Sequence, residues 1–174
     1  MKTIDKLPFY CIFAIVFISS CVNFHNQKYD ANRTDESFTK SLKEKQIGNS
    51  NFYISIPTDY SIKENRGPDF STFYIIPTDT TIKGDFSCGL YFGNFPSLFP
   101  PDNNNCKTET VKSEILNKNK EWTVYVYGND YSIQTIVENK KNEGWNEKVH
   151  AFGHGKSVTE VDKILKIYST LRTK

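Results

Sequence analysis

The stretch "EWTVYVYGNDYSIQTIVE", residues 121–138, contains two β-type runs separated by a tight turn. Valine, isoleucine, tyrosine and threonine dominate both runs, and these residue types favour strands. Gly128, Asn129 and Asp130 tolerate the positive φ that a short hairpin turn requires. The stretch therefore predicts an antiparallel hairpin, and with it an antiparallel sheet.

Runs with the same strand-favouring composition occur along most of the chain, and many of them end at a proline or glycine. These further runs cover residues 51–57, 59–65, 70–77, 86–96, 108–116 and 145–155. Together with the hairpin they predict about eight strands at spacings of roughly 8 to 12 residues, as in antiparallel β structure.

The C-terminal segment 157–172 has a different period. Its apolar residues recur at the spacing of one helical face: Val161, Ile164, Leu165, Tyr168 and Leu171. Ser157, with Glu160 three residues later, forms a capping-box pattern at its start. The segment predicts an amphipathic helix that lies across the sheet and buries its apolar face there.

The predicted fold class is α+β, a mostly antiparallel sheet of about eight strands with a C-terminal helix. The order of elements resembles the fold group of PsbP, Mog1 and the DcrB-type envelope lipoproteins over residues 46–174. The local features that carry this resemblance are "YISIPTDYSI" (53–62), "GPDFSTFYI" (67–75) and the final "IYSTLR" (167–172). A lipocalin-like barrel is the alternative, although the early Gly-x-Trp of lipocalins is missing.

The N-terminal residues 1–20 have the layout of a secretory signal peptide. Lys2 and Lys6 precede an apolar run from Leu7 to Ile18, which is too short for a span of about 20 residues. The run ends in Ile18-Ser19-Ser20-Cys21, which resembles a bacterial lipobox. The resemblance implies a diacylglycerol thioether on Cys21 and cleavage before it; a soluble secreted protein is the alternative.

A polar segment, residues 21–45, separates this cysteine from the predicted domain at 46–174. It is low in aliphatic residues and has no sustained period, so it predicts a flexible tether between lipid and domain. The predicted location is thus the bacterial cell envelope, with the domain outside the cytoplasm and anchored to a membrane by lipid.

Two cysteines, Cys88 and Cys106, remain after the signal peptide and the lipidation site are set aside. An even pair in an exported protein predicts a disulfide; two buried free thiols are the alternative. The net charge of +2 falls to +1 when Lys2 and Lys6 leave with Asp5, and the lysines are scattered. A nearly neutral chain with scattered lysines has no basic patch that would attract the phosphates of a nucleic acid, so the charge pattern gives no support for nucleic-acid binding.

No motif in the sequence predicts catalysis, a metal or a cofactor. His150 and His154 are four residues apart on a predicted strand, about 13 Å along it, which is too far to share one tetrahedral metal. Gly155-Lys156-Ser157 lacks the first glycine of a phosphate-binding loop. The Gly-x-Ser-x-Gly elbow of many hydrolases is also missing. We expect a non-enzymatic protein.

The best predicted contact surface is the proline-punctuated stretch "LYFGNFPSLFPPDNNNC", residues 90–106. Phe95, Leu98 and Phe99 are its candidate partner-binding residues, because aromatic anchors dominate interface energetics. The alternative is that they pack onto the core. We therefore expect an accessory module that binds another envelope protein. Alternative functions are a carrier of a small apolar ligand and an immunity protein against a secreted toxin.

Overall fold

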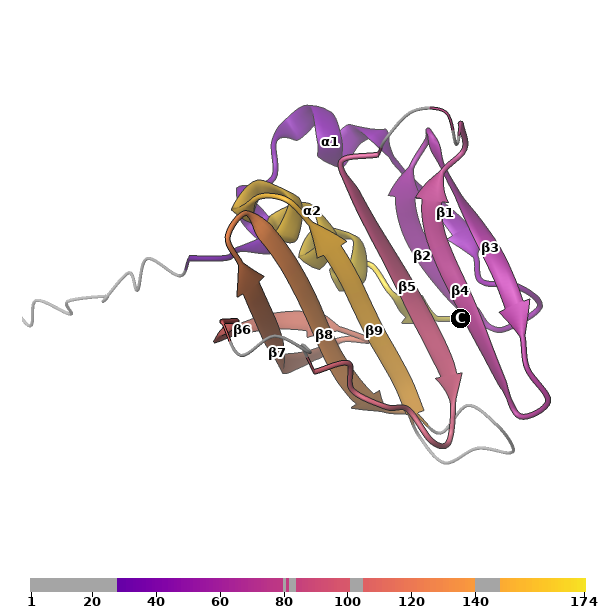
Figure 1. Ribbon diagram of the computed structural model, residues 1–174. Helices are drawn as coiled ribbons and strands as arrows, with labels where there is room; N and C mark the ends of the chain where they lie inside the picture. The colour runs from indigo at the N-terminus through magenta and orange to yellow at the C-terminus, as the bar shows by residue number, and fades with distance from the viewer. Residues whose placement is uncertain (1–27, 80, 82–83, 101–104, 140–147) are drawn as a thin grey trace, which may run out of the picture.

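A seven-stranded antiparallel sheet dominates the computed structural model, which describes residues 28–79, 81, 84–100, 105–139 and 148–174 (Figure 1). Its strand order is β3-β4-β5-β9-β8-β7-β6. The strands are β3 (Tyr60–Arg66), β4 (Phe70–Pro77), β5 (Phe86–Gly93), β6 (Lys107–Ile115), β7 (Lys118–Tyr127), β8 (Asp130–Glu138) and β9 (Lys148–Gly155). The predicted hairpin is β7–β8, where Tyr127 pairs with Asp130 and positive φ falls on Gly128.

A second layer covers one face of this sheet. It holds the helix α2 (Val158–Ser169) and a small sheet of order β1-β2-β10, whose strands are Leu42–Gln46, Phe52–Pro57 and Arg172–Thr173. In Figure 1, α2 runs behind the large sheet. The Phe52 ring of β2 lies 4.8 Å from the Phe92 ring of β5, so the small sheet and the helix share the core with one face of the large sheet.

The predicted helix is confirmed. Ser157 is its N-cap, and the Ser157 Oγ accepts the Glu160 N–H at 3.2 Å, while the Glu160 carboxylate accepts the Lys156 N–H. The Tyr168 hydroxyl reaches the strands β5 and β9, where it accepts the Gly89 N–H at 3.0 Å and lies 2.7 and 2.6 Å from the carbonyls of Gly89 and Phe152, which share its single proton. The apolar stripe of α2 is fully buried, as predicted.

The α+β fold class is confirmed, and the predicted strands correspond to β2 to β9. The barrel alternative is wrong, because the described strands form an open sheet with β3 and β6 at its edges. No helix among the described residues is long and apolar enough to span a bilayer. The predicted signal peptide and Cys21 lie outside the described residues.

The prediction of a flexible tether over residues 21–45 is wrong from Lys28 onward. This segment forms a short 3-10 helix at Ala31–Arg33, the helix α1 at Glu36–Ser41, and β1. Tyr29 and Phe38 are its two buried side chains, with 1% and 9% of their surface exposed. These two buried aromatic side chains and the pairing of β1 with β2 contribute to the order of a segment whose composition is otherwise polar.

The predicted disulfide between Cys88 and Cys106 is not formed, and both are free cysteines. Cys88 lies in the middle of β5, whereas Cys106 directly precedes β6. Three strands separate β5 from β6, which corresponds to about 19 Å across the sheet. A disulfide needs Cα atoms within about 7 Å. Burial raises the pKa of the Cys88 thiol to about 12, so this cysteine is an inert core residue.

Candidate functional site

The face of the large sheet that points away from α2 carries a group of aromatic side chains. His150 and Phe152 of β9 point to this outer face, and Tyr74 of β4 lies across β5 from Phe152, with ring centroids 6.3 Å apart. Gly89 of β5 stands between them. A Cβ atom at Gly89 would come within 2.6 Å of the Phe152 ring, so the absence of a side chain there lets this ring lie across the strand.

The three residues predicted to bind a partner lie on the loop that follows β5. Phe95, Leu98 and Phe99 expose 80%, 52% and 55% of their surface, so the alternative that they pack into the core is wrong. The Phe99 ring contacts the outer face, 5.1 Å from the His150 ring and 5.5 Å from the Phe152 ring. We name Tyr74, Phe95, Leu98, Phe99 and Phe152 together the outer aromatic surface.

A buried glutamine fixes the loop to the sheet. Gln134 of β8 is 2% exposed, and its Oε1 accepts the Phe99 N–H at 3.0 Å while its Nε2 donates to the Phe99 carbonyl at 3.2 Å. The same Oε1 lies 3.0 Å from His150 Nε2, which can donate to it. Gln134 thus pairs with the Phe99 backbone as a further strand would, and it was not identified from the sequence.

His150 supports this arrangement as a neutral residue. It is 1% exposed, and burial lowers its pKa to about 4. The imidazole therefore stays uncharged at neutral pH beneath the Phe99 ring. His154, four residues further along β9 and on the same face, is exposed instead, with its Nε2 3.6 Å from the Asp130 carboxylate. The structure does not bring the two histidines to a common site.

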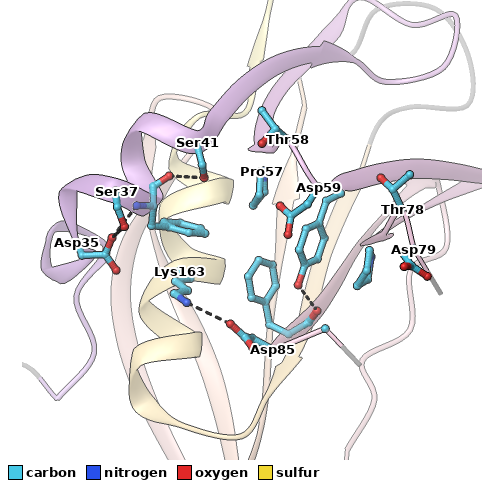
Figure 2. A pocket seen from close by; sticks show the side chains of 15 residues that line it. Asp35, Ser37, Ser41, Pro57, Thr58, Asp59, Thr78, Asp79, Asp85 and Lys163 are labelled. Carbon is cyan, nitrogen blue, oxygen red and sulfur yellow. Dashed lines mark hydrogen bonds and ion pairs between the residues drawn. The ribbon is translucent and has the colours of Figure 1, made fainter. Parts of the chain in front are cut away.

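A pocket of about 660 Å³ opens at a different place, beside α1 (Figure 2). Its walls come from α1, the β2–β3 turn, the end of β4, the start of β5, and α2. Among the described residues, its charged lining consists of Asp35, Asp59, Asp79, Asp85 and Lys163, and we name it the acidic pocket. The apolar part of its lining consists of Phe38, Pro57, Tyr60, Pro77 and Phe86.

The base of the acidic pocket is rigid. The Tyr60 and Phe86 rings stack with centroids 4.8 Å apart, and the Tyr60 hydroxyl donates to the Phe86 carbonyl at 3.2 Å. The Phe38 ring packs edge-on against Phe86 at 6.2 Å. Burial raises the pKa of Tyr60 to about 12, so its hydroxyl remains a neutral donor.

The described residues form no cluster of metal-ligating side chains. No three histidine, cysteine or carboxylate side chains within the described ranges are placed to hold a metal ion. Comparisons with protein-family models, with curated proteins and with solved structures give no match. The outer aromatic surface and the acidic pocket are therefore the features from which a function can be argued.

Proposed function

We propose that this chain is a lipid-anchored protein of the bacterial cell envelope, without enzymatic activity, whose domain binds another envelope protein. The outer aromatic surface is the proposed contact. The observation that carries this proposal is Phe95, a phenylalanine that is 80% exposed on the same loop as Leu98 and Phe99, both more than half exposed. Large apolar side chains exposed together on one short loop are typical of interaction sites.

The fixed position of the loop strengthens the proposal. Binding costs less entropy when the contact residues are already held in place. Gln134 holds the Phe99 backbone by two hydrogen bonds, and the Phe152 and His150 rings support the Phe99 side chain from below. A carrier of an apolar ligand is less well supported, since the acidic pocket combines its apolar base with four carboxylates.

The test of the contact surface is a capture experiment with the full chain in its native membrane. After photocrosslinking, the Phe95→Ser/Phe99→Ser variant is expected to lose the crosslinked partner while its thermal unfolding stays close to that of the parent protein. Tyr53→Ser, which replaces an aromatic residue of the small sheet outside this surface, is the matched control. Capture that survives the double substitution, or is lost equally in the control, contradicts the proposal.

The role of the fixed loop has its own test. Gln134→Ala removes no aromatic side chain but frees the Phe99 backbone, so we expect weaker capture. It also leaves His150 without this partner and is expected to cost about 1 to 3 kcal/mol of stability. Capture is therefore compared well below the unfolding temperature of each variant. If NMR relaxation shows that the loop is mobile in Gln134→Ala and capture is nevertheless undiminished, preorganisation of the loop has no role in binding.

The anchor is tested separately by the intact mass of the protein extracted from its native membrane. We expect a mass that begins at Cys21 and includes acyl chains, and we expect Cys21→Ala to leave the membrane fraction. Stable anchoring needs more than one acyl chain, at about 0.8 kcal/mol per buried methylene. An unlipidated mass, or one that retains residues 1–20, would refute the proposed location without affecting the contact surface.

A further inference from the structure

We infer that protonation of His150 lifts the loop of residues 94–100 off the sheet, so that the outer aromatic surface binds its partner at neutral pH and loses it in acid. This regulation rests on the proposed function, because it acts on the same contact surface. Its starting point is a buried histidine on an uncovered face. His150 is 1% exposed, yet it points to the face of the large sheet opposite α2 and the small sheet.

The loop of residues 94–100 covers the imidazole of His150. The Phe99 ring lies over the His150 ring, with centroids 5.1 Å apart and planes inclined by 36°. The Phe152 ring flanks the imidazole at 5.4 Å and packs edge-on against Phe99. Figure 1 shows the chain after β5 crossing in front of β9 and β8, on the side away from α2. Lifting the loop would therefore return the imidazole to water.

Two hydrogen bonds hold this loop to the sheet within the described part of the chain, and Gln134 makes both of them. Its Oε1 accepts the Phe99 N–H at 3.0 Å, and its Nε2 donates to the Phe99 carbonyl at 3.2 Å. Pro96 and Pro100 have no N–H with which to add to them. A segment with so few bonds can open locally while the sheet beneath it stays folded.

The closed loop favours a neutral imidazole. His150 Nε2 lies 3.0 Å from the same Gln134 Oε1, so it can donate within the network that holds Phe99. Burial lowers the pKa of His150 to about 4 from its ordinary value of 6.5. The physical cause of this shift is that an imidazolium beneath the loop would lose its hydration.

The titratable neighbours of His150 on the outer face come from β5, β8 and β9. Tyr91 of β5 lies directly opposite His150, while Lys148 lies two residues before it on β9 and opposite Glu138 of β8. The lysine and the glutamate carry opposite charges, so their effects on an imidazolium oppose each other. Residues 94–100 contain no charged side chain. The loop therefore acts on His150 through burial, and its release acts through hydration.

The closed loop and the proton on His150 oppose each other. With the loop lifted, the imidazole is hydrated and regains a pKa of about 6.5, so the lifted state binds more protons than the closed state between pH 4 and pH 6.5. The ratio of lifted to closed loop then rises about 20-fold from pH 7 to pH 5. Binding of the partner weakens because Phe99 is no longer held in place.

Hydrogen exchange of the Phe99 amide, in the full chain held in a nonionic detergent, tests the inference without a partner. After correction for the intrinsic exchange rate, we expect its protection to fall about 20-fold from pH 7 to pH 5. At both pH values it should stay far below the protection of the Gly89 amide, which donates to Tyr168 in the core. Equal protection of the two amides would mean that the loop opens only when the whole domain unfolds, which would overturn the inference.

Two histidine variants assign the pH dependence to one residue. His150→Gln keeps a side-chain N–H that can donate to Gln134 but cannot titrate, so the protection of the Phe99 amide should no longer depend on pH. His154→Gln, which replaces the exposed histidine of the same face, is the matched control and should show the same fall as the parent protein. Protection that is constant in the parent, or that rises in acid because the imidazolium attracts the Phe99 ring, would overturn the inference.

The capture experiment, repeated at pH 7 and pH 5, separates this inference from the proposed function. Weaker capture by the parent protein at pH 5, with a smaller loss in His150→Gln, supports the regulation. Capture by the parent that is as strong at pH 5 as at pH 7 overturns it. Absence of capture at pH 7 refutes the contact surface instead, while exchange of the Phe99 amide still decides whether His150 controls the loop.

Discussion

Replacing Tyr29 by alanine tests whether the segment before α1 is part of the folded domain. Tyr29 is 1% exposed, packs edge-on against Tyr131 with centroids 6.3 Å apart, and donates from its hydroxyl to Glu109 Oε2 at 2.6 Å. The neighbouring Asp30 N–H donates to Asp162 Oδ1 of α2 at 2.6 Å. These contacts fasten the segment to β6, β8 and α2 at once.

The expected cost follows from the burial of the ring. Truncation of a fully buried aromatic side chain to alanine costs about 3 to 5 kcal/mol, out of a total stability of about 5 to 15 kcal/mol. Tyr29→Phe removes only the hydroxyl, and Glu109 keeps its contacts with Lys28 and Lys107, so we expect about 1.5 kcal/mol for that variant. The larger loss corresponds to a fall in the unfolding temperature of about 12 °C in a domain of this size.

Two measurements check this prediction. Denaturant unfolding gives the loss of free energy, with the exposed Phe95→Ala as a control expected to change it by less than about 0.5 kcal/mol. Hydrogen exchange of the Asp30 amide reports on the segment itself, and we expect protection in the parent protein that Tyr29→Ala abolishes. If Tyr29→Ala unfolds like the parent and the Asp30 amide exchanges freely in both, the segment is a tether and the reasoning fails.

Three further perturbations have defined outcomes. The pKa of His150 is about 4 in the folded protein and 6.5 in the unfolded chain, so the unfolded state binds more protons between these pH values. The free energy of unfolding therefore falls by up to about 3 kcal/mol as the pH drops from 6.5 to 4. Melting temperatures should depend less on pH over this range in His150→Gln, and equal slopes in the two proteins would contradict the assignment. Tyr168→Phe leaves the buried Gly89 and Phe152 groups without the hydroxyl and should cost about 2 kcal/mol in denaturant unfolding, and a change below 0.5 kcal/mol would count against this bond. Ser157→Ala removes the N-cap of α2 and should cost about 1 kcal/mol, whereas Ser157→Asp should restore it; a neutral alanine variant would argue against the cap.

The strands and the C-terminal helix could be predicted because their signals are local. Alternation marks β2 and β7, and the Ser157–Glu160 pair with its apolar stripe marks α2. β1 could not be predicted in this way. Its sequence "LKEKQ" has a single apolar residue, and it is a strand only because each of its residues pairs with β2.

The N-terminal segment and the cysteines show the limit of composition as evidence. A single tyrosine in a polar stretch carries no periodic signal, and the partner of Tyr29 is Glu109, 80 residues away. The disulfide prediction rested on an even number of cysteines and on the compartment. It failed because the chain crosses from β5 to the far edge of the sheet before it reaches Cys106.

The exposed loop was predicted from its prolines and aromatics, but its attachment was not. Phe95, Leu98 and Phe99 could be selected because large apolar side chains are unusual in a proline-rich loop. Gln134 lies on a strand 35 residues away, where it resembles an ordinary polar residue of an alternating run. The acidic pocket draws on five separate segments, and only the folded chain brings its aspartates together.

The ordered N-terminal segment also limits how far the domain can travel. Since the fold begins by Lys28, only seven residue steps separate it from Cys21, and they span at most about 25 Å when fully extended. That reach is shorter than the diameter of a domain of this size. If Cys21 carries the proposed lipid, the first ordered residue of the domain stays within about 25 Å of the lipidated cysteine. The domain then contacts only molecules close to the surface of its own membrane. Any partner must then come to that surface to be bound.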